Sequence, residues 1–455
     1  MMFSPQQAAQ WTGGVWDTTP SVNAFSAVTH DSRTVTPGAL YVAIRGENQD
    51  GSIYVPAAAQ MGAAAAIVPA DATLPNAPIP LLRTPDTRRA LANLAAAWRT
   101  LRNPFCIGIT GSVGKTSVKD FLAHLLEPLG PVAKTNGNWN NEIGLPRSLL
   151  TIAPDTKNGV FECGTNHPGE IAALVRILRP DAAILTAIAP CHIGNFGSEQ
   201  AIAEEKADLL RCLPPSGFAV LPSQSPFFPL FQEACRHCTI VSTAVLSQNN
   251  PCTADFVAQI LDETIGSFAV CENQTNLTYT VKTGVPGVHM IYNALLAIAA
   301  ARIRGVLPEQ ITARIQSSPR APMRWQIIEK NGLRYINDAY NANPASMKAA
   351  LETFAKTPSQ GRHVAVLGDM GELGDKSQEL HRLVGTEAAR IHPDLLLCIG
   401  PQSLQIANAA IEAGFPSSAL LHYPEIPSEL PLQSGDLVLL KASRFMKLER
   451  LLPPQ

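Results

Sequence analysis

The stretch Phe105-Cys-Ile-Gly-Ile-Thr-Gly-Ser-Val-Gly-Lys-Thr-Ser117 carries an apolar run into a glycine-rich turn, and a helical pattern follows it. A strand, a glycine-rich loop and a helix in this order open a doubly wound α/β domain. The glycines let backbone N–H groups curl round phosphate oxygens, and the helix N-terminus adds positive potential. The stretch therefore predicts a phosphate-binding loop. The helix is predicted from apolar residues that recur at i, i+3 and i+4, namely Val118, Phe121, Leu122, Leu125 and Leu126.

Two side chains of this loop suit phosphate chemistry. Lys115 can reach the outer phosphates of a nucleotide, and Thr116 can ligate magnesium. The spacing departs from the usual motif, because Gly111 lies only three residues before Gly114. A chance glycine-rich turn is the alternative, but Gly-Lys-Thr in this context favours ATP or GTP, without distinguishing a kinase, GTPase, motor or ligase. The predicted nucleotide-binding residues are Thr110, Gly111, Ser112, Val113, Gly114, Lys115, Thr116 and Ser117.

The rest of the chain divides into further α/β blocks. Its 455 residues exceed one compact core, and usual domain sizes predict about three units. Strand-like runs alternate with helical patterns to about residue 315, which is typical of a parallel sheet, and a third block follows. The predicted architecture is a small N-terminal α/β domain over 1–100, a central P-loop domain with a mostly parallel, doubly wound sheet over 101–315, and a C-terminal Rossmann-like domain over 316–455.

Individual elements are predicted within these blocks. We expect strands over 40–44, 65–68, 159–161, 182–185, 333–336, 363–367, 395–399 and 436–440, and helices over 89–101 and 198–210. Ser198 is the predicted cap of the second of these helices.

Composition argues against several classes of protein. Hydrophobic residues make up 46% and charged residues 16% of the chain, which is typical of a globular protein. The net charge of -2 lacks the basic field that favours nucleic-acid binding. No basic segment with an apolar core starts the chain, and the alanine-rich runs near 57–69 and 294–301 are too short to span a bilayer. We expect a cytoplasmic protein with no nucleic-acid partner and no membrane insertion.

The cysteines favour reduced thiols. Nine cysteines at irregular spacings, mostly in apolar contexts, do not form a disulfide framework. Cys235-Arg-His-Cys238 has the spacing of half a zinc site, but no second nearby pair completes four ligands, so buried thiols are the favoured interpretation.

Three further residues are candidates for metal or phosphate chemistry. Glu162 ends an apolar strand, where it is either an oxygen ligand for nucleotide-bound magnesium or an edge glutamate in solvent. Lys206 falls within an apolar helical stripe beside Ile202 and Leu209. An unpaired ammonium is costly there, so the lysine is either functional or modified, or its stem covers the stripe while its head reaches water. His192, in a polar loop, is either a ligand or a structural histidine.

The third block offers two polar segments. Asp338-Ala-Tyr-Asn-Ala-Asn-Pro344 follows a predicted strand and forms either a satisfied turn network or a ligand-contacting loop. The segment from Asp436 to Glu449 contains Lys441-Ala-Ser-Arg444, whose cations can hold a substrate carboxylate or simply face solvent.

Several long segments resemble the Mur ligase family, over almost the whole chain. Within the family they are most similar to the branch that adds D-alanyl-D-alanine, as the asparagine-rich segment and Asn341-Ala-Asn-Pro344 indicate. The matching segments are Asp31-Ser-Arg33, Gly46-Glu-Asn-Gln-Asp-Gly51, the loop 110–117, Lys134-Thr-Asn-Gly-Asn-Trp-Asn-Asn-Glu-Ile-Gly-Leu-Pro146, Glu162-Cys-Gly-Thr-Asn-His-Pro-Gly-Glu170, 338–344, Leu367-Gly-Asp-Met-Gly-Glu-Leu-Gly374 and 441–449.

The resemblance implies an ATP-dependent ligase. Such an enzyme joins D-alanyl-D-alanine to UDP-N-acetylmuramoyl-tripeptide through an acyl phosphate, giving the pentapeptide precursor of peptidoglycan. ATP and Mg²⁺ are the implied cofactors, a monomer is expected, and the N-terminal domain is expected to hold the UDP-sugar.

The resemblance also implies roles for single residues. Lys115, Glu162, His192 and Lys206 become the expected catalytic residues, and Thr116, Glu162, His192 and a carbamylated Lys206 the expected magnesium ligands. Asn293, Arg324 and Asp338 are the expected nucleotide contacts from later segments. The expected substrate contacts are Ser32, Arg33, Gly46, Asp50, Gly51, Asn138, Asn140, Asn141, Tyr340, Asn341, Asn343, Lys441, Ser443 and Arg444.

Four departures from the family pattern spare the catalytic candidates. They are Ser52, Met290, Leu221-Pro-Ser223 and Ala442, of which Ser52 can alter the sugar contacts and Met290 the adenine pocket. A Mur-type ligase that adds a single amino acid and a P-loop NTPase without ligase activity remain the alternatives. No guanine-reading Asn-Lys-x-Asp segment supports the latter.

Overall fold

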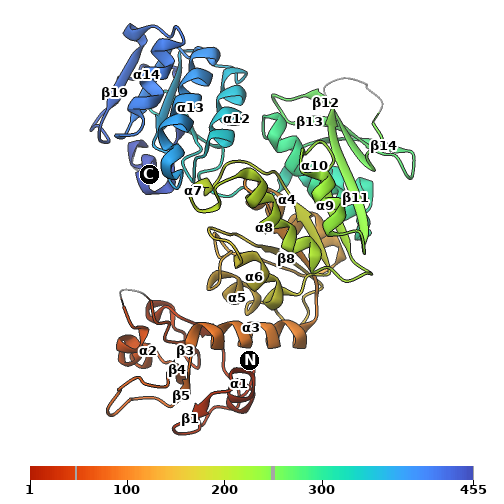
Figure 1. Cartoon of the computed structure of the whole chain (residues 1–455), viewed down its shortest axis with the longest axis vertical. Coiled ribbons are helices and arrows are strands. Elements are labelled where there is room, and N and C mark those ends of the chain that lie inside the picture. Colours follow the sequence, from red (N-terminus) through yellow and green to blue (C-terminus); the bar gives the residue numbers. More distant parts are fainter. Residues whose placement is uncertain (47–48, 247–251, 454–455) are drawn as a thin grey trace. The chain divides into compact units, whose positions relative to one another are not determined.

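The chain folds into three β-sheets that follow one another along the sequence (Figure 1). The computed structural model describes residues 1–46, 49–246 and 252–453. Glu47 and Asn48, which belong to one of the segments that carry the family resemblance, lie outside the described residues. Each sheet lies within one of the three predicted ranges, and the boundaries near residues 100 and 315 remain a prediction.

The N-terminal sheet has five strands in the order β1-β5-β4-β3-β2, of which only β1 is antiparallel to its neighbour. Helix α3 follows it and confirms the predicted helix. It begins after Asp86, whose side chain accepts hydrogen bonds from two backbone N–H groups, and ends at Asn103 in the left-handed conformation. The elements are β1 (Val15–Trp16), β2 (Val28–Thr29), β3 (Leu40–Val42), β4 (Ala65–Pro69), β5 (Leu81–Thr84), α1 (Pro5–Thr12), α2 (Val55–Gln60) and α3 (Thr87–Arg102).

The middle sheet has nine strands in the order β14-β13-β12-β11-β10-β9-β6-β8-β7. The predicted strands over 159–161 and 182–185 correspond to β8 and β9. The strands are β6 (Phe105–Thr110), β7 (Val132–Lys134), β8 (Asn158–Glu162), β9 (Ala182–Leu185), β10 (Phe218–Pro222), β11 (Thr239–Leu246), β12 (Phe256–Asp262), β13 (Ser267–Glu272) and β14 (Leu277–Lys282). The helices are α4 (Lys115–Leu126), α5 (Gly144–Leu149), α6 (Glu170–Leu178), α7 (Ile193–Phe196), α8 (Glu199–Arg211), α9 (Phe228–Ala234), α10 (Val288–Ile303) and α11 (Pro308–Arg314).

One expectation about this sheet is wrong. Strand–helix alternation was expected to about residue 315, but β12, β13 and β14 form consecutive antiparallel hairpins. The reason is local, because only residues 263–266 and 273–276 connect these strands. A parallel connection needs a crossover of a dozen or more residues, so connections this short can only reverse the chain.

The C-terminal sheet has six strands in the order β15-β16-β20-β17-β18-β19, parallel except for the edge pair β15 and β16. The predicted Rossmann-like alternation is therefore confirmed. The elements are β15 (Gln326–Lys330), β16 (Leu333–Asn337), β17 (His363–Gly368), β18 (Leu395–Ile399), β19 (Leu420–Tyr423), β20 (Leu437–Lys441), α12 (Pro344–Ala355), α13 (Ser377–Ile391) and α14 (Leu404–Glu412).

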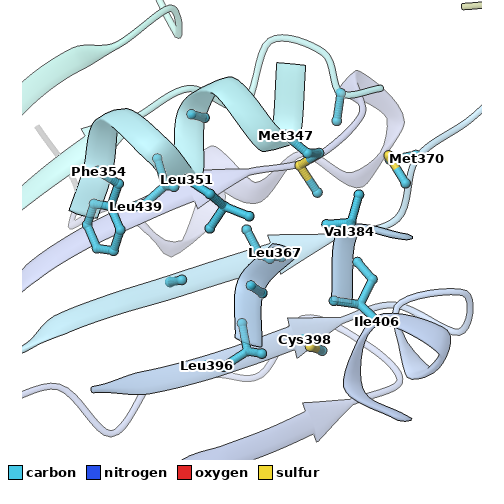
Figure 2. Packing of buried hydrophobic residues seen from close by; sticks show 14 of the residues in the cluster. Met347, Leu351, Phe354, Leu367, Met370, Val384, Leu396, Cys398, Ile406 and Leu439 are labelled. Atoms are coloured by element: carbon cyan, nitrogen blue, oxygen red, sulfur yellow. The ribbon is translucent and has the colours of Figure 1, made fainter. Parts of the chain in front are cut away.

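Helices cover this sheet with apolar side chains. Figure 2 shows Met347, Leu351 and Phe354 of α12 directed toward the strands that carry Leu367 and Leu439. All five belong to one buried cluster. Burying such side chains contributes roughly 1.5–3 kcal/mol each, so this packing fixes the loops at the ends of the strands.

The described residues group into two compact units, and residues of the middle sheet belong to both of them. The first compact unit comprises Met1–Gly108, Gly130–Thr165 and Gly169–Ala182, and the second compact unit comprises Ile109–Leu129, Asn166–Pro168 and Ala183–Gln455. Within the part of the chain that the structure describes, no helix is both long and apolar enough to cross a membrane.

Candidate active site

The predicted phosphate-binding loop connects β6 to α4, as the sequence indicates. Gly111 has φ +150° and Gly114 has φ +88°, which are conformations that other residues rarely adopt. Lys115 starts α4, and its Nζ donates to Gly111 O at 2.6 Å. The lysine head therefore curls back over the loop, where a phosphate-binding lysine is needed.

The segment after β9 fixes the shape of this loop. Thr186 Oγ1 donates to Val113 O at 2.5 Å, and a Cβ on Gly111 would lie 1.8 Å from the same hydroxyl. Ser112 donates from its backbone N to Ala187 O at 2.7 Å and from Oγ to Ala189 O at 2.9 Å. Ser112 is thus committed to holding the loop, and its contact with nucleotide stays a prediction.

Two predicted nucleotide contacts from later segments lie at the loop. A Cβ on Gly114 would lie 2.4 Å from Asn293 Oδ1, so the Asn293 side chain touches the turn. Arg324 Nη2 donates to Thr116 Oγ1 at 3.2 Å, and its guanidinium stacks over the Tyr340 ring at 4.3 Å. The second compact unit therefore gathers residues that are more than 200 positions apart in the chain around one phosphate-binding loop.

Asp338, the third predicted nucleotide contact, is held next to Arg324. Its Oδ1 accepts from the backbone N of Trp325 at 3.1 Å, and its Oδ2 accepts from Lys441 Nζ at 2.6 Å. Lys441 Nζ also lies within hydrogen-bonding distance of Asp338 O and Asn341 O, at 3.4 and 3.3 Å. Lys441 is 3% exposed, so its ammonium is already engaged by the 338–341 loop, and substrate binding by it stays a prediction.

Lys206 lies inside the protein. Helix α8 begins after Ser198, whose Oγ accepts from Ala201 N, which confirms the predicted cap. Lys206 is 3% exposed, so the interpretation that its head reaches water is wrong. Burial raises the pKa of the Cys191 thiol to about 11, whereas the charges of Lys115 and Lys206 oppose that rise. Both lysines therefore lie close enough to Cys191 for their charges to act on it.

His192 precedes α7 in the left-handed conformation, with φ 54°. Its Nδ1 lies 2.8 Å from the Glu372 carboxylate, and this hydrogen bond lowers the pKa of Glu372. The preceding residue, Cys191, accepts at Sγ from Asn343 Nδ2 at 2.7 Å. The loop that carries His192 is thereby connected to two loops of the C-terminal sheet.

Glu162 belongs to the first compact unit. It ends β8, is 1% exposed, and its backbone N donates to Thr135 Oγ1 at 2.9 Å. The interpretation as a solvent-exposed edge glutamate is therefore wrong. Asn140 Nδ2 lies 3.4 Å from Glu162 Oε2, and Asn141 Oδ1 accepts from Gly144 N at 2.8 Å. The asparagine-rich loop, with Asn138 exposed, thus lies against the end of this strand.

The N-terminal candidates form two rigid turns in the same unit. The Arg33 guanidinium donates twice to Asp31, at 2.9 and 2.8 Å, and this contact lowers the pKa of Asp31 to about 2. Asp50 accepts from Arg45 at 2.8 Å. A Cβ on Gly51 would lie 2.7 Å from a backbone oxygen, so only glycine fits there. Ser32 lies in the 3₁₀ turn 32–34, and Gly46 donates from its backbone N to Gln49 O.

The remaining candidates lie in loops that contact one another. Asn343 caps α12 by accepting from Ser346 N at 2.9 Å. Ser443 Oγ accepts from Gly371 N at 2.9 Å and donates to Ala342 O at 3.3 Å. Arg444 pairs with Glu449 at 2.6 Å. These contacts hold the loops together, and the substrate contacts of Tyr340, Asn341, Asn343, Ser443 and Arg444 stay predictions.

Metal binding of the predicted kind would use unusual ligands. Among residues 1–46, 49–246 and 252–453, no three His, Cys, Asp or Glu side chains gather into a metal-binding group. The predicted set contains only two such residues, Glu162 and His192, beside Thr116 and Lys206. All nine cysteines are free thiols, and Cys235 Sγ donates to Phe231 O at 3.0 Å.

Three residues around these loops are not among the candidates that the sequence indicates. Thr186 and Cys191 shape the phosphate-binding loop and its neighbour, and Glu372 pairs with His192. Glu372 lies within 367–374, one of the segments that resemble the family, so the sequence offered a reason to select it. It offered no such reason for Thr186 and Cys191, because a threonine at a strand end and a buried cysteine are ordinary in sequence.

Three family models match the chain in succession. The Mur ligase family, catalytic domain, matches residues 24–99, the Mur ligase middle domain matches 109–301, and the Mur ligase, glutamate ligase domain, matches 323–444.

Curated relatives match nearly the full length. The UDP-N-acetylmuramoyl-tripeptide--D-alanyl-D-alanine ligase of Bacillus subtilis is 34% identical, covering 93% of this chain and 92% of the relative. The ligase of the same name from Escherichia coli is 35% identical, covering 85% and 84%.

Solved structures agree with the three-domain α/β fold. MurF from Acinetobacter baumannii superposes with a TM-score of 0.88 at 31% identity, covering 99% of this chain and 98% of that one. MurF ligase from Thermotoga maritima, in complex with ADP, superposes with a TM-score of 0.77 at 26% identity, covering 94% and 96%. On the matched residues, the identity and the shared fold, the chain belongs to the Mur ligase family.

Proposed function

We propose that this chain is the ATP-dependent ligase that joins D-alanyl-D-alanine to UDP-N-acetylmuramoyl-tripeptide, forming the pentapeptide precursor of peptidoglycan. The observation that carries the proposal is the convergence of Lys115, Asn293 and Arg324 on one glycine-rich loop. The relatives that share this function at 34% and 35% identity cover most of the chain and support the substrate assignment.

The reaction divides into two transfers. The terminal carboxylate of the tripeptide attacks the γ-phosphorus of ATP, ADP leaves, and an acyl phosphate forms. The amine of D-alanyl-D-alanine then attacks the acyl carbon, loses its proton, and phosphate leaves as the amide forms. Lys115 and the amides of the loop 110–117 stabilise the charge on the transferring phosphoryl group.

Magnesium would be held by Thr116, Glu162, His192 and Lys206. The buried Glu162 carboxylate and the Thr116 hydroxyl are oxygen donors of the kind magnesium prefers. A lysine ammonium cannot ligate a cation, but a carbamate can, and it forms when the neutral amine of Lys206 adds to carbon dioxide and loses a proton. The bound ion would neutralise the phosphate charge.

The remaining predicted substrate contacts fall into two groups, one in the first compact unit and one in the C-terminal loops. The first compact unit contains the predicted substrate contacts Arg33, Asp50 and Asn141, of which the first two belong to the N-terminal range expected to hold the UDP-sugar. The loops 338–343 and 441–444 supply the predicted contacts to the incoming dipeptide. We also propose domain boundaries near residues 100 and 315, a monomer, and a place in the cytoplasm, where the UDP-linked substrate and ATP are available.

The test is phosphate release from ATP and magnesium with UDP-N-acetylmuramoyl-tripeptide, comparing D-alanyl-D-alanine with single amino acids as acceptor. Turnover that depends on the dipeptide, with the pentapeptide product identified by mass, is the expected result. Turnover only with a single amino acid would assign the chain to another branch of the family. Nucleotide binding without turnover on any acceptor would favour a P-loop NTPase and contradict the proposal.

A further inference from the structure

An unpaired guanidinium lies in the first compact unit. Arg147, on the short helix α5, stacks over the Trp139 ring with its Cζ 3.6 Å from the centroid. Within the part of the chain that the structure describes, no hydrogen bond or ion pair involves its side chain. It is only partly exposed, so water compensates the guanidinium incompletely.

The surface on which Arg147 stacks is rigid. Ser148 Oγ donates to Trp139 O at 3.2 Å, and Trp139 N donates to Asn136 O at 3.1 Å. A Cβ on Gly144 would lie 2.4 Å from Trp139 Cα, so the helix and the loop are in direct backbone contact. The cation is therefore held in place before any ligand arrives, which reduces the entropy cost of binding.

His30, in the N-terminal segment, lies close enough to Arg147 for the charge of Arg147 to act on it. Burial and the charge of Arg147 both lower the pKa of His30, and the buried Nδ1 of His30 has no hydrogen-bond partner among the described residues. The carboxylate of Asp31, which acts on both groups, is already engaged by two hydrogen bonds from Arg33. Among the described residues, the neighbourhood therefore offers a guanidinium and a buried ring nitrogen that both lack a hydrogen-bond partner.

We propose that Arg147 and His30 bind an anionic group of the UDP-linked substrate, either its diphosphate or a carboxylate of its peptide. The inference rests on the proposed function, because His30 directly precedes the segment 31–33 and Arg147 directly follows the segment 134–146, and both segments are predicted to contact that substrate. A guanidinium matches the paired oxygens of phosphate and carboxylate alike, and it binds them more strongly when partly removed from water.

The experiment measures the affinity of the full-length protein for UDP and for UDP-N-acetylmuramoyl-tripeptide by calorimetry. Arg147→Met keeps an apolar stem over Trp139 and removes the charge. It should weaken binding by about 10- to 100-fold, the usual effect of losing a charged hydrogen bond. Arg147→Lys should recover part of the affinity. Arg88→Met is the matched control, because Arg88 lies in the same compact unit but is already paired with Glu142 at 2.6 Å.

The outcomes separate the two anions. Weaker binding of both ligands in Arg147→Met assigns the contact to the diphosphate, and weaker binding of the tripeptide compound alone assigns it to a peptide carboxylate. Unchanged affinity for both, or an equal loss in Arg88→Met, would overturn the inference. Failure of the wild-type protein to bind the tripeptide compound would instead contradict the proposed function, so the two failures are distinguishable.

Discussion

The burial of Lys206 limits the chemical roles that its side chain can have. Lys206 is 3% exposed on helix α8, so its charge has to be balanced by groups within the protein rather than by water. The proposed carbamate would form from the neutral amine and carbon dioxide, and it would place an anion at this buried position.

We predict that Lys206→Ala lowers ligase turnover by on the order of 100-fold, the usual effect of removing one group that stabilises transition-state charge. Phosphate release is the measurement, with ADP affinity as the control that the loop 110–117 remains intact. Added short carboxylic acids should restore part of the activity by replacing the carbamate. Full activity in Lys206→Ala would exclude a magnesium-binding role.

The ion pair between Lys441 and Asp338 should contribute to stability. Lys441→Met removes one partner of an ion pair whose side chains are 3% and 18% exposed. Leaving the other charge unpaired should lower the free energy of unfolding by about 3–5 kcal/mol. Urea unfolding followed by circular dichroism checks this. Arg390→Met removes two ion pairs, with Glu352 and Glu387, at an arginine that is 54% exposed, and it should cost much less stability because water screens these charges. Equal losses of unfolding free energy in the two variants would show that the Lys441–Asp338 pair contributes no more than an exposed ion pair.

Contacts with other elements determine the conformation of the glycine-rich loop. Gly111→Ala should abolish ADP binding, because its Cβ would lie 1.8 Å from Thr186 Oγ1 and its φ of +150° is unsuited to alanine. The comparison is Gly414→Ala, at φ +94° with no atom within 4 Å of the added Cβ, which should cost only roughly 1 kcal/mol of stability. Equal ADP affinity in both variants, measured by calorimetry, would contradict the proposed loop role.

A buried ion pair joins α10 to β13. Arg302 donates to Glu272 at 2.5 and 3.0 Å, and Tyr279 and Thr275 donate to the same carboxylate. Burial raises the pKa of Glu272, but these hydrogen bonds outweigh it, so the pKa in the folded protein is lowered. The folded state therefore binds fewer protons than the unfolded chain. The stabilisation is present above the unfolded pKa of about 4.3 and is lost as the pH falls through the lowered folded value.

We predict that Glu272→Gln lowers stability at pH 7 by about 3 kcal/mol and flattens the decrease in melting temperature below pH 5. Thermal unfolding between pH 3 and pH 7, at about one-unit steps, measures both effects. Glu412→Gln, which removes a carboxylate that is 60% exposed, should leave the pH profile nearly unchanged. If the melting temperatures of wild type and Glu272→Gln fell in parallel as the pH is lowered, the protonation of Glu272 would not be coupled to unfolding.

At the scale of the whole molecule, the proposed reaction requires that water be kept from an acyl phosphate. With ATP and UDP-N-acetylmuramoyl-tripeptide but no dipeptide, ADP formation should stop near one equivalent per enzyme molecule. Hydroxylamine should then yield the hydroxamate of the tripeptide, detected by mass. Continuous ADP release without acceptor, and no hydroxamate, would argue against an acyl phosphate held within the enzyme.

The sequence by itself determined the elements and the chemistry that depends on neighbours in the chain. The 3.6-residue and apolar patterns around residues 105–126 predict β6, the loop and α4, and the cap at Ser198 predicts the start of α8, because these interactions span a few residues. The same patterns predicted three α/β sheets. They failed at β12 to β14, where short turns rather than strand composition set the strand direction.

Only the tertiary structure decided which distant residues meet. It brings Arg324 to Thr116, Asn293 to Gly114 and Glu372 to His192, and it places Arg147 on Trp139, with no hydrogen bond or ion pair to its side chain among the described residues. It also decided that Lys206 and Glu162 are buried, which the sequence left open. The physical reason is that burial and charge pairing depend on packing between segments far apart in the chain, whereas helix and strand patterns depend on local periodicity.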